Sequence, residues 1–190
     1  MMPSQIIHLA IAQKYLQKHP HAVKDVRKFF DGNVLPDLAN DKAQSHCGIR
    51  TEMFDIVKRN REKVSPAKFA ATHDMAEDLN RGQYLHLYVD DKYYNDFLLK
   101  YFQQRLSGER IGTDMYETSR RDDAYLQQKY GVAYGDTHLE SELRKINEIW
   151  DEENAIKRRQ VGYEFTFPYG IKDLETFIDK MSDAQIPQGK

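Results

Sequence analysis

The sequence has one cysteine, Cys47, in 190 residues, so no disulfide can form within the chain. Its first residues lack the basic flank, apolar stretch and small-residue cleavage site of a secretory signal peptide. No apolar run approaches the roughly twenty residues that a helix needs to cross a bilayer. Together these absences predict a cytoplasmic protein with no transmembrane segment.

An excess of either charge is also missing, since 28 Lys and Arg residues stand against 30 Asp and Glu residues. The formal net charge of −2 creates no field that would attract a nucleic-acid backbone or an anionic membrane. We therefore expect no nucleic acid as a structural partner.

The chain is long enough for one core and has no internal repeat or low-complexity linker. We predict one domain over residues 1–183, followed by a flexible tail at 184–190.

Hydrophobic periodicity runs through almost the whole sequence, and it predicts an all-α fold. Ser4 is the expected N-cap of the first helix, while Ser65 followed by Pro66 is typical of a helix start. Gly131 is expected to close a further helix. The predicted helices cover about 4–19, 22–30, 65–80, 82–105, 114–130, 137–159 and 171–182.

Two segments depart from this helical pattern. Gly32, Asn33 and Pro36 in DGNVLPD are expected to end the second helix, so that Asp37 would lie in or just after a loop. Residues 161–168 alternate polar and apolar side chains like a strand and end at a proline. Because a proline cannot donate to a sheet, we predict a short extended segment there rather than a paired strand. The expected fold is a single-domain bundle of several helices.

Ionisable residues with the chemistry of metal ligands interrupt the apolar parts of the chain. His86 and Asp90 are four positions apart in RGQYLHLYVDD, which stacks them on one face of a helix. A buried charge costs several kcal/mol unless it is paired or bound to a metal. Asp37, His46 and His8, the last on the apolar face of the first helix, supply three more nitrogen or oxygen donors. These residues predict a divalent metal site, although a local His–Asp hydrogen bond would also account for the helical pair.

Three segments in this order resemble the zinc-dependent phospholipase C family, part of the larger group that includes P1-type nucleases. The resemblance covers residues 4 to about 130. It is carried by a His-bearing first helix, a G-N-x-x-P-D segment, a downstream S/T-H pair and an H-x-x-x-D helix. In this sequence they read IIHLAIAQKYL, FFDGNVLPDLANDKAQSHCG and RGQYLHLYVDDKYYNDF.

The resemblance implies a bundle of the phospholipase C / P1 nuclease type and assigns roles to the five donors. Asp37, His46, His86 and Asp90 would be metal ligands, and Asp90 would bridge towards a second ion held by His8. Asp37 would also be the general base that takes a proton from the attacking water. The ligand chemistry suits one or two Zn²⁺ ions, with Fe, Mn or Ni as alternatives.

The sequence departs from the family pattern at the third metal. Secreted relatives have a histidine six residues after the bridging aspartate, whereas Asp96 occupies that position here. His138 and Glu142 have the H-x-x-x-E spacing of the remaining ligands but lie much farther along the chain. We therefore expect His138 to be structural and leave a further metal site at these two residues open.

The resemblance implies an enzyme, a metal-dependent hydrolase that cleaves a small phosphodiester or phosphomonoester with metal-activated water. A lipid, a nucleotide or another phosphoester fits this expectation equally well, and no pattern specifies an oligomeric state. One alternative is an HD-type metal-dependent phosphohydrolase that uses His46, His73 and Asp74. The other is a non-catalytic, metal-binding helical module.

Overall fold

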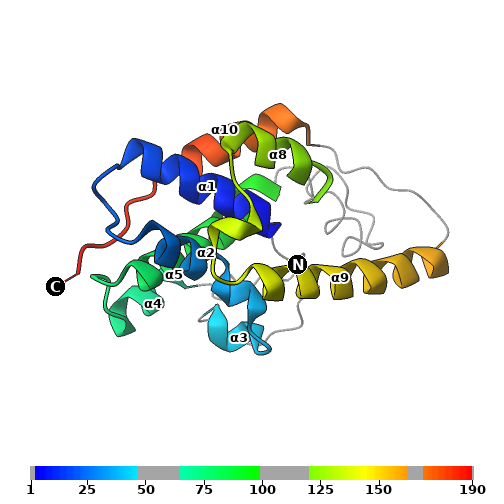
Figure 1. Ribbon diagram of the computed structural model, residues 1–190, viewed down its shortest axis with the longest axis horizontal. Coiled ribbons are helices and arrows are strands. Elements are labelled where there is room, and N and C mark those ends of the chain that lie inside the picture. Colours follow the sequence, from blue (N-terminus) through cyan, green and yellow to red (C-terminus); the bar gives the residue numbers. More distant parts are fainter. Residues whose placement is uncertain (1–2, 47–64, 99–119, 162–168, 190) are drawn as a thin grey trace.

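The computed structural model describes residues 3–46, 65–98, 120–161 and 169–189 (Figure 1). Every regular element in these ranges is a helix and none is a strand, which confirms the all-α prediction. None of these helices combines the length and apolar character that crossing a membrane requires. The elements are α1 (Gln5–Lys18), α2 (Val26–Leu38), α3 (Lys42–Ser45), α4 (Pro66–Thr72), α5 (Asp78–Lys92), the π-helix η1 (Tyr93–Leu98), α8 (Asp123–Tyr130), the 3₁₀ turn η2 (Tyr134–Asp136), α9 (Glu140–Val161) and α10 (Ile171–Met181).

Local sequence signals begin α1 and α4 and end α8 where they were expected to. The Ser4 hydroxyl caps α1 by accepting a hydrogen bond from the N–H three residues further on, and Ser65 caps α4 in the same way. Pro66 occupies the first turn of α4. Gly131 ends α8 with a φ of 64°, a left-handed conformation that costs glycine little. These caps depend on neighbouring residues only, which is why the sequence predicts them.

The prediction that Gly32 and Pro36 end the second helix is wrong. Helix α2 continues through both residues to Leu38, so Asp37 lies in its last turn and not in a loop. Pro36 removes one backbone donor only two residues before the helix ends, where the loss is small. At Gly32 an added Cβ would lie 1.9 Å from the Leu79 carbonyl oxygen. The glycine therefore permits close contact between two helices, which outweighs its poor intrinsic helix propensity.

Helices α2 and α5 cross with their backbones in contact. An added Cβ at Gly82 of α5 would lie 2.1 Å from the Phe29 carbonyl oxygen of α2, the counterpart of the approach at Gly32. No side chain separates the two helices at this crossing. The contact fixes the position of His86 and Asp90, which follow Gly82 on α5, relative to the end of α2.

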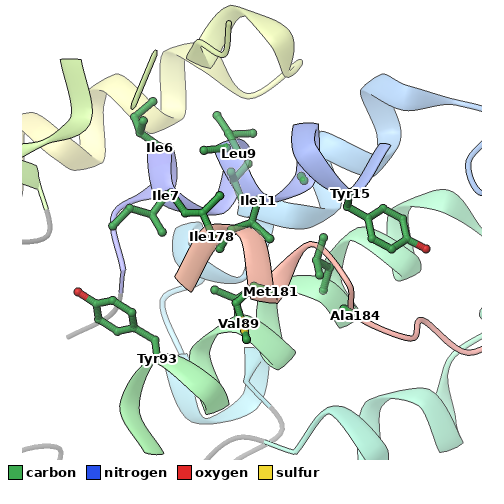
Figure 2. Close-up of a cluster of buried hydrophobic side chains, with 14 of the residues drawn as sticks. Ile6, Ile7, Leu9, Ile11, Tyr15, Val89, Tyr93, Ile178, Met181 and Ala184 are labelled. Atoms are coloured by element: carbon green, nitrogen blue, oxygen red, sulfur yellow. The ribbon is translucent and has the colours of Figure 1, made fainter. Parts of the chain in front are cut away.

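The first eight residues of α1, Gln5–Ala12, are all buried. Figure 1 shows α8 and α10 on one side of it and α2 and α5 on the other, and all four helices contact it. In Figure 2, Ile7 and Ile11 lie beside Ile178 of α10, with Val89 of α5 close by. A helix segment that is buried on all sides belongs to the core. His8 is carried into this core and has no exposed surface.

Other predicted boundaries also differ, and the helix predicted over 65–80 ends as α4 at Thr72. Helix α5 begins at Asp78, four residues before Gly82, and continues as the π-helix η1. Helix α9 includes Val161, the first residue of the predicted extended segment, while 162–168 lie outside the described residues. The predicted continuation of the metal helix over 99–105 and the start of the next helix at 114–119 also lie outside them.

The last residues carry two buried side chains, although the sequence predicts a flexible tail there. Ala184 is 3% exposed and Ile186 is 6% exposed. An added Cβ at Gly189 would lie 2.6 Å from Ala76, in the connection between α4 and α5. Within the described part of the tail, residues 184–189 therefore pack against the helices.

A buried carboxylate next to the start of α1 should make the stability of the protein depend on pH. The Ser4 hydroxyl donates to Asp123 Oδ1 at 2.5 Å, and the Asp123 side chain is 14% exposed. Burial raises the pKa of Asp123 to about 7, although Arg120, with its Nε 3.7 Å from Oδ2, acts in the opposite direction. The Asp123 carboxyl group thus binds its proton more tightly in the folded protein than in the unfolded chain.

We expect the free energy of unfolding to fall as pH rises from about 4 to about 7, because the stabilising proton is lost over that range. The contribution of Asp123 should be on the order of 4 kcal/mol. Urea unfolding at several pH values, compared with Asp123→Asn, measures it. The variant should lack this part of the pH dependence, and parallel curves for the two proteins would contradict the prediction.

Candidate metal centre

The five predicted ligands come from four parts of the chain and meet in the interior. His8 lies on α1, Asp37 in the last turn of α2, His46 directly after α3, and His86 with Asp90 on α5. None of the five residues is more than 4% exposed. The contact between α2 and α5 and the burial of α1 bring together side chains that are up to 82 positions apart (90 − 8) in the sequence.

Asp90 lies at the centre of the three imidazoles. Its Oδ1 is 3.4 Å from His8 Nε2, and its Oδ2 is 3.2 Å from His46 Nε2 and 3.4 Å from His86 Nε2. Neither oxygen has a partner with hydrogen-bond geometry among the described residues. Ligand atoms that surround a tetrahedral zinc ion at about 2.0–2.1 Å are about 3.4 Å from one another. The spacing of these donors therefore fits shared coordination of a metal ion.

Hydrogen bonds on the far side of two imidazoles orient their nitrogens. His86 Nδ1 lies 2.9 Å from the Asn33 carbonyl oxygen, so Nδ1 must carry a proton and donate it. His46 Nδ1 lies 2.8 Å from Ser45 Oγ, and that hydroxyl itself donates to the Pro36 carbonyl at 3.1 Å. His46 Nδ1 is thus also the donor. Both Nε2 lone pairs point into the cluster, the arrangement that metal-binding histidines adopt.

The two Nε2 atoms of His46 and His86 are only 3.2 Å apart. With both Nδ1 atoms protonated, two neutral imidazoles would direct lone pairs at each other across this distance. A cation between them removes that repulsion, and the nearby Asp90 carboxylate favours a cation as well. The cluster therefore has the donors to hold a positive ion.

Asp37 is oriented by a neighbour and by its place in the helix. Gln5 Nε2 donates to Asp37 Oδ2 at 3.1 Å, and Asp37 Oδ1 is 4.0 Å from His86 Nε2. The C-terminal end of a helix carries a partial negative charge. Asp37 lies in the last turn of α2, so the partial charge of the helix end adds to the charge of its carboxylate. Both negative charges favour a cation here.

Two overlapping groups of donors can each hold an ion. His8, His86 and Asp90 form one, and Asp37, His46 and His86 form the other. Within each group, one ligand atom of every residue lies within 4.8 Å of those of the others. The geometry fits one or two ions and leaves the identity of the metal open.

The charges within the cluster set its ionisation. Burial raises the pKa of Asp90, but the neighbouring imidazoles outweigh burial and hold that pKa well below its usual value. Burial and then the charge of His86 lower the pKa of His8. Burial also lowers the pKa of His86, yet the charge of Asp90 leaves it raised overall. An ionised Asp90 and a neutral His8 are the protonation states that metal binding requires, whereas at His86 a metal ion must compete with a proton.

The residues of the HD-type alternative lie elsewhere. His73 and Asp74 are exposed at the end of α4, where the His73 ring stacks on Phe69 with the ring centres 3.9 Å apart. Neither residue belongs to a donor group in the described part of the chain. The structure does not join them to His46.

The residues considered for a third ion also stay apart from the cluster. His138 Nδ1 lies 2.7 Å from Asp31 Oδ2, which gives this histidine a structural partner. Glu142 is exposed and accepts a hydrogen bond from Ser141. Asp96 is 48% exposed and lies 3.6 Å from Lys92. No donor group of the described residues includes any of them.

Sequence reasoning assigned no role at the metal centre to Gln5, Asn33 or Ser45, which orient the candidate ligands. Asn33 and Ser45 stand inside the quoted family motifs, directly after the glycine of G-N-x-x-P-D and directly before His46. Their positions inside these motifs could have indicated that they lie next to the candidate ligands. Gln5 had none, since its contact with Asp37 joins residues 32 positions apart.

Comparisons of the chain with models of known protein families, with curated proteins and with solved structures find no match. The resemblance to the phospholipase C family therefore stays a prediction. The function has to be inferred from the buried cluster itself.

Proposed function

We propose that this protein is a metal-dependent phosphoester hydrolase whose ions are held by His8, Asp37, His46, His86 and Asp90. One observation carries the proposal: Nε2 of His46 and Nε2 of His86 face each other at 3.2 Å, beside Asp90, while each Nδ1 donates away from the cluster. The resemblance to zinc-dependent phospholipase C supports the same five residues.

The donor set supports a catalytic ion of borderline or hard character. It consists of imidazoles and carboxylates without a thiolate, whereas many structural zinc sites are closed by cysteines. When bound, a divalent ion lowers the pKa of a coordinated water towards neutrality and stabilises charge on phosphoryl oxygens. Zn²⁺ is the first expectation, and Fe, Mn or Ni suits the same ligands.

Asp37 is the proposed proton acceptor. Gln5 holds one of its oxygens at 3.1 Å, so the carboxylate has a fixed orientation. The other oxygen, Oδ1, faces the imidazole of His86 at 4.0 Å, on the side of the cluster. A carboxylate positioned in this way can take a proton from an attacking water, and general bases of this kind contribute about 10²–10⁴ in rate.

The test is turnover of bis-p-nitrophenyl phosphate and p-nitrophenyl phosphate, with metal content measured on the same samples. We expect Asp37→Asn to lower kcat by about 10²–10⁴, because the general base is lost. Bound metal should fall far less, since four other donors remain. Equal turnover by the two proteins, or full turnover after removal of the metal, would contradict the proposed mechanism.

Asp74→Asn is the matched control. Its carboxylate is exposed and accepts only a nearby backbone N–H, from Ala76 at 2.9 Å, among the contacts of the described residues. Its turnover should match that of the unmodified protein. Loss of turnover in this variant and not in Asp37→Asn would favour the HD-type alternative.

A non-catalytic metal-binding module is the second candidate. It is favoured by the burial of the ligands, none of which is more than 4% exposed. Such a module would hold metal and lose thermal stability on chelation, as the proposed hydrolase would, since binding to the folded state alone stabilises it. It would not turn over any phosphoester, and that difference separates the two.

A further inference from the structure

Tyr94 lies on the π-helix η1, directly beyond the helix that carries His86 and Asp90. It follows Asp90 by four positions, which places it about one turn further along and near the same face. π-Helical turns are rare and occur frequently at functional sites. Tyr94 is thus joined directly to the helix that carries two of the candidate ligands.

The hydroxyl of Tyr94 is buried and has no hydrogen-bond partner among the described residues. Its neighbour Tyr93 is different, since the Tyr93 hydroxyl lies 3.1 Å from the hydroxyl of Tyr169. Buried tyrosine hydroxyls usually have a partner, because an unmet one loses its hydrogen bonds to water without replacement. A bound ligand that accepts a hydrogen bond would therefore satisfy the Tyr94 hydroxyl, which has no partner among the described residues.

The electrostatic surroundings of this hydroxyl make it a donor. Burial, followed by the negative charges of Asp90 and Asp37, raises the pKa of Tyr94 well above its usual value. The two carboxylates of the metal centre thus act directly on this group. The hydroxyl stays protonated, and it makes a hydrogen bond to neither carboxylate.

We propose that the Tyr94 hydroxyl donates a hydrogen bond to an oxygen of the phosphoryl group bound at the metal centre. This role of Tyr94 rests on the proposed hydrolase function. Ionised phosphoryl oxygens accept hydrogen bonds and cannot donate them, so they complement a protonated hydroxyl. The metal ions would still be held by the five ligands alone. Tyr94 would bind the substrate phosphoester and the phosphate that a phosphomonoesterase releases, and would take no part in holding the metal.

The experiment measures the affinity of the metal-loaded protein for inorganic phosphate by isothermal titration calorimetry, for the unmodified chain and for Tyr94→Phe. We expect the variant to bind phosphate about 10- to 100-fold more weakly, the loss of one hydrogen bond to a charged group. Metal content should be unchanged. The melting temperature of the metal-free variant should not fall, because the hydroxyl contributes no hydrogen bond to the described fold.

Tyr88→Phe is the control. Tyr88 is a half-buried tyrosine on α5, two positions before Asp90 and so on a different face of the helix, with Lys92 Nζ 5.9 Å from its ring. Its phosphate affinity should equal that of the unmodified protein. A similar loss in both variants would show a general effect of removing tyrosine hydroxyls and would overturn the assignment.

The outcomes separate this inference from the function on which it rests. An unmodified protein that holds no metal would overturn both. A metal-loaded protein that binds no phosphate, or one that binds it equally well with and without the Tyr94 hydroxyl, would overturn the role of Tyr94. Turnover of phosphodiesters would in that case still support the hydrolase.

Discussion

Replacing Gly82 with alanine should destabilise the protein by at least about 3 kcal/mol, because the new Cβ has no room. It would lie 2.1 Å from the Phe29 carbonyl oxygen and 2.8 Å from the Asn33 backbone nitrogen. These are backbone atoms of a packed helix and cannot move independently. Helices α2 and α5 would have to separate. Urea unfolding followed by circular dichroism measures the loss.

The same separation should weaken metal binding. His86 follows Gly82 by one turn, and its Nδ1 donates to the Asn33 carbonyl across the contact between the two helices. Moving the helices apart breaks that hydrogen bond and turns the imidazole away from Asp90. Loss of such an orienting partner typically costs about 10- to 100-fold in metal affinity.

Gly135→Ala is the control for this substitution. An added Cβ there meets only the end of the Glu140 side chain, at 3.2 Å, which can rotate away. Its stability should remain within about 0.5 kcal/mol of the unmodified protein. If Gly82→Ala were as stable as the unmodified protein, the close approach of α2 and α5 would be incorrect.

Asp90→Asn should remove most metal binding. Asp90 is the one carboxylate that lies within 3.4 Å of the Nε2 atoms of three imidazoles in the described cluster, His8, His46 and His86. An amide keeps the shape of the side chain and removes its charge, so the cation loses the central negative partner. The affinity should fall by more than the about 10- to 100-fold that loss of an orienting partner costs. Metal analysis after dialysis and calorimetric titration of Zn²⁺ measure the change.

Asp96→Asn provides the comparison, six residues further along. Its side chain is 48% exposed and lies 3.6 Å from Lys92 Nζ. It occupies the position where secreted members of the resembled family have a further metal ligand, yet it belongs to no donor group of the described residues. Metal binding should be unchanged. Full metal retention by Asp90→Asn, or loss of metal in Asp96→Asn, would contradict the assignment of the centre.

Much of the local structure could be predicted, because its causes lie within a few residues. The i, i+4 spacing alone places His86 and Asp90 on one helix face. Ser4 caps α1 through a hydroxyl next to the first turn, and Gly131 ends α8 through its own backbone freedom. The choice of five donors also came from the sequence, through residue types and their order. The structure brings those five together in two overlapping groups.

The failure at DGNVLPD has a definite cause. Glycine and proline are helix breakers when only local propensity counts, and a cost of about 1 kcal/mol for the glycine is real. Contact with α5 decides the outcome instead, since Gly32 allows the Leu79 carbonyl to approach its backbone. A partner 47 positions away (79 − 32) in the chain leaves no mark on local propensity.

The sequence by itself determined that the chain is helical, where several helices begin and end, and which side chains have the chemistry of metal ligands. Those properties follow from short-range periodicity, capping and residue type. Only the tertiary structure decided that Asp37 lies in a helix, that Asn33 and Ser45 orient His86 and His46, and that the Tyr94 hydroxyl has no partner among the described residues. Apart from the contact between the neighbours Ser45 and His46, each of these depends on packing between segments distant in the chain, where burial and close contact outweigh local preference.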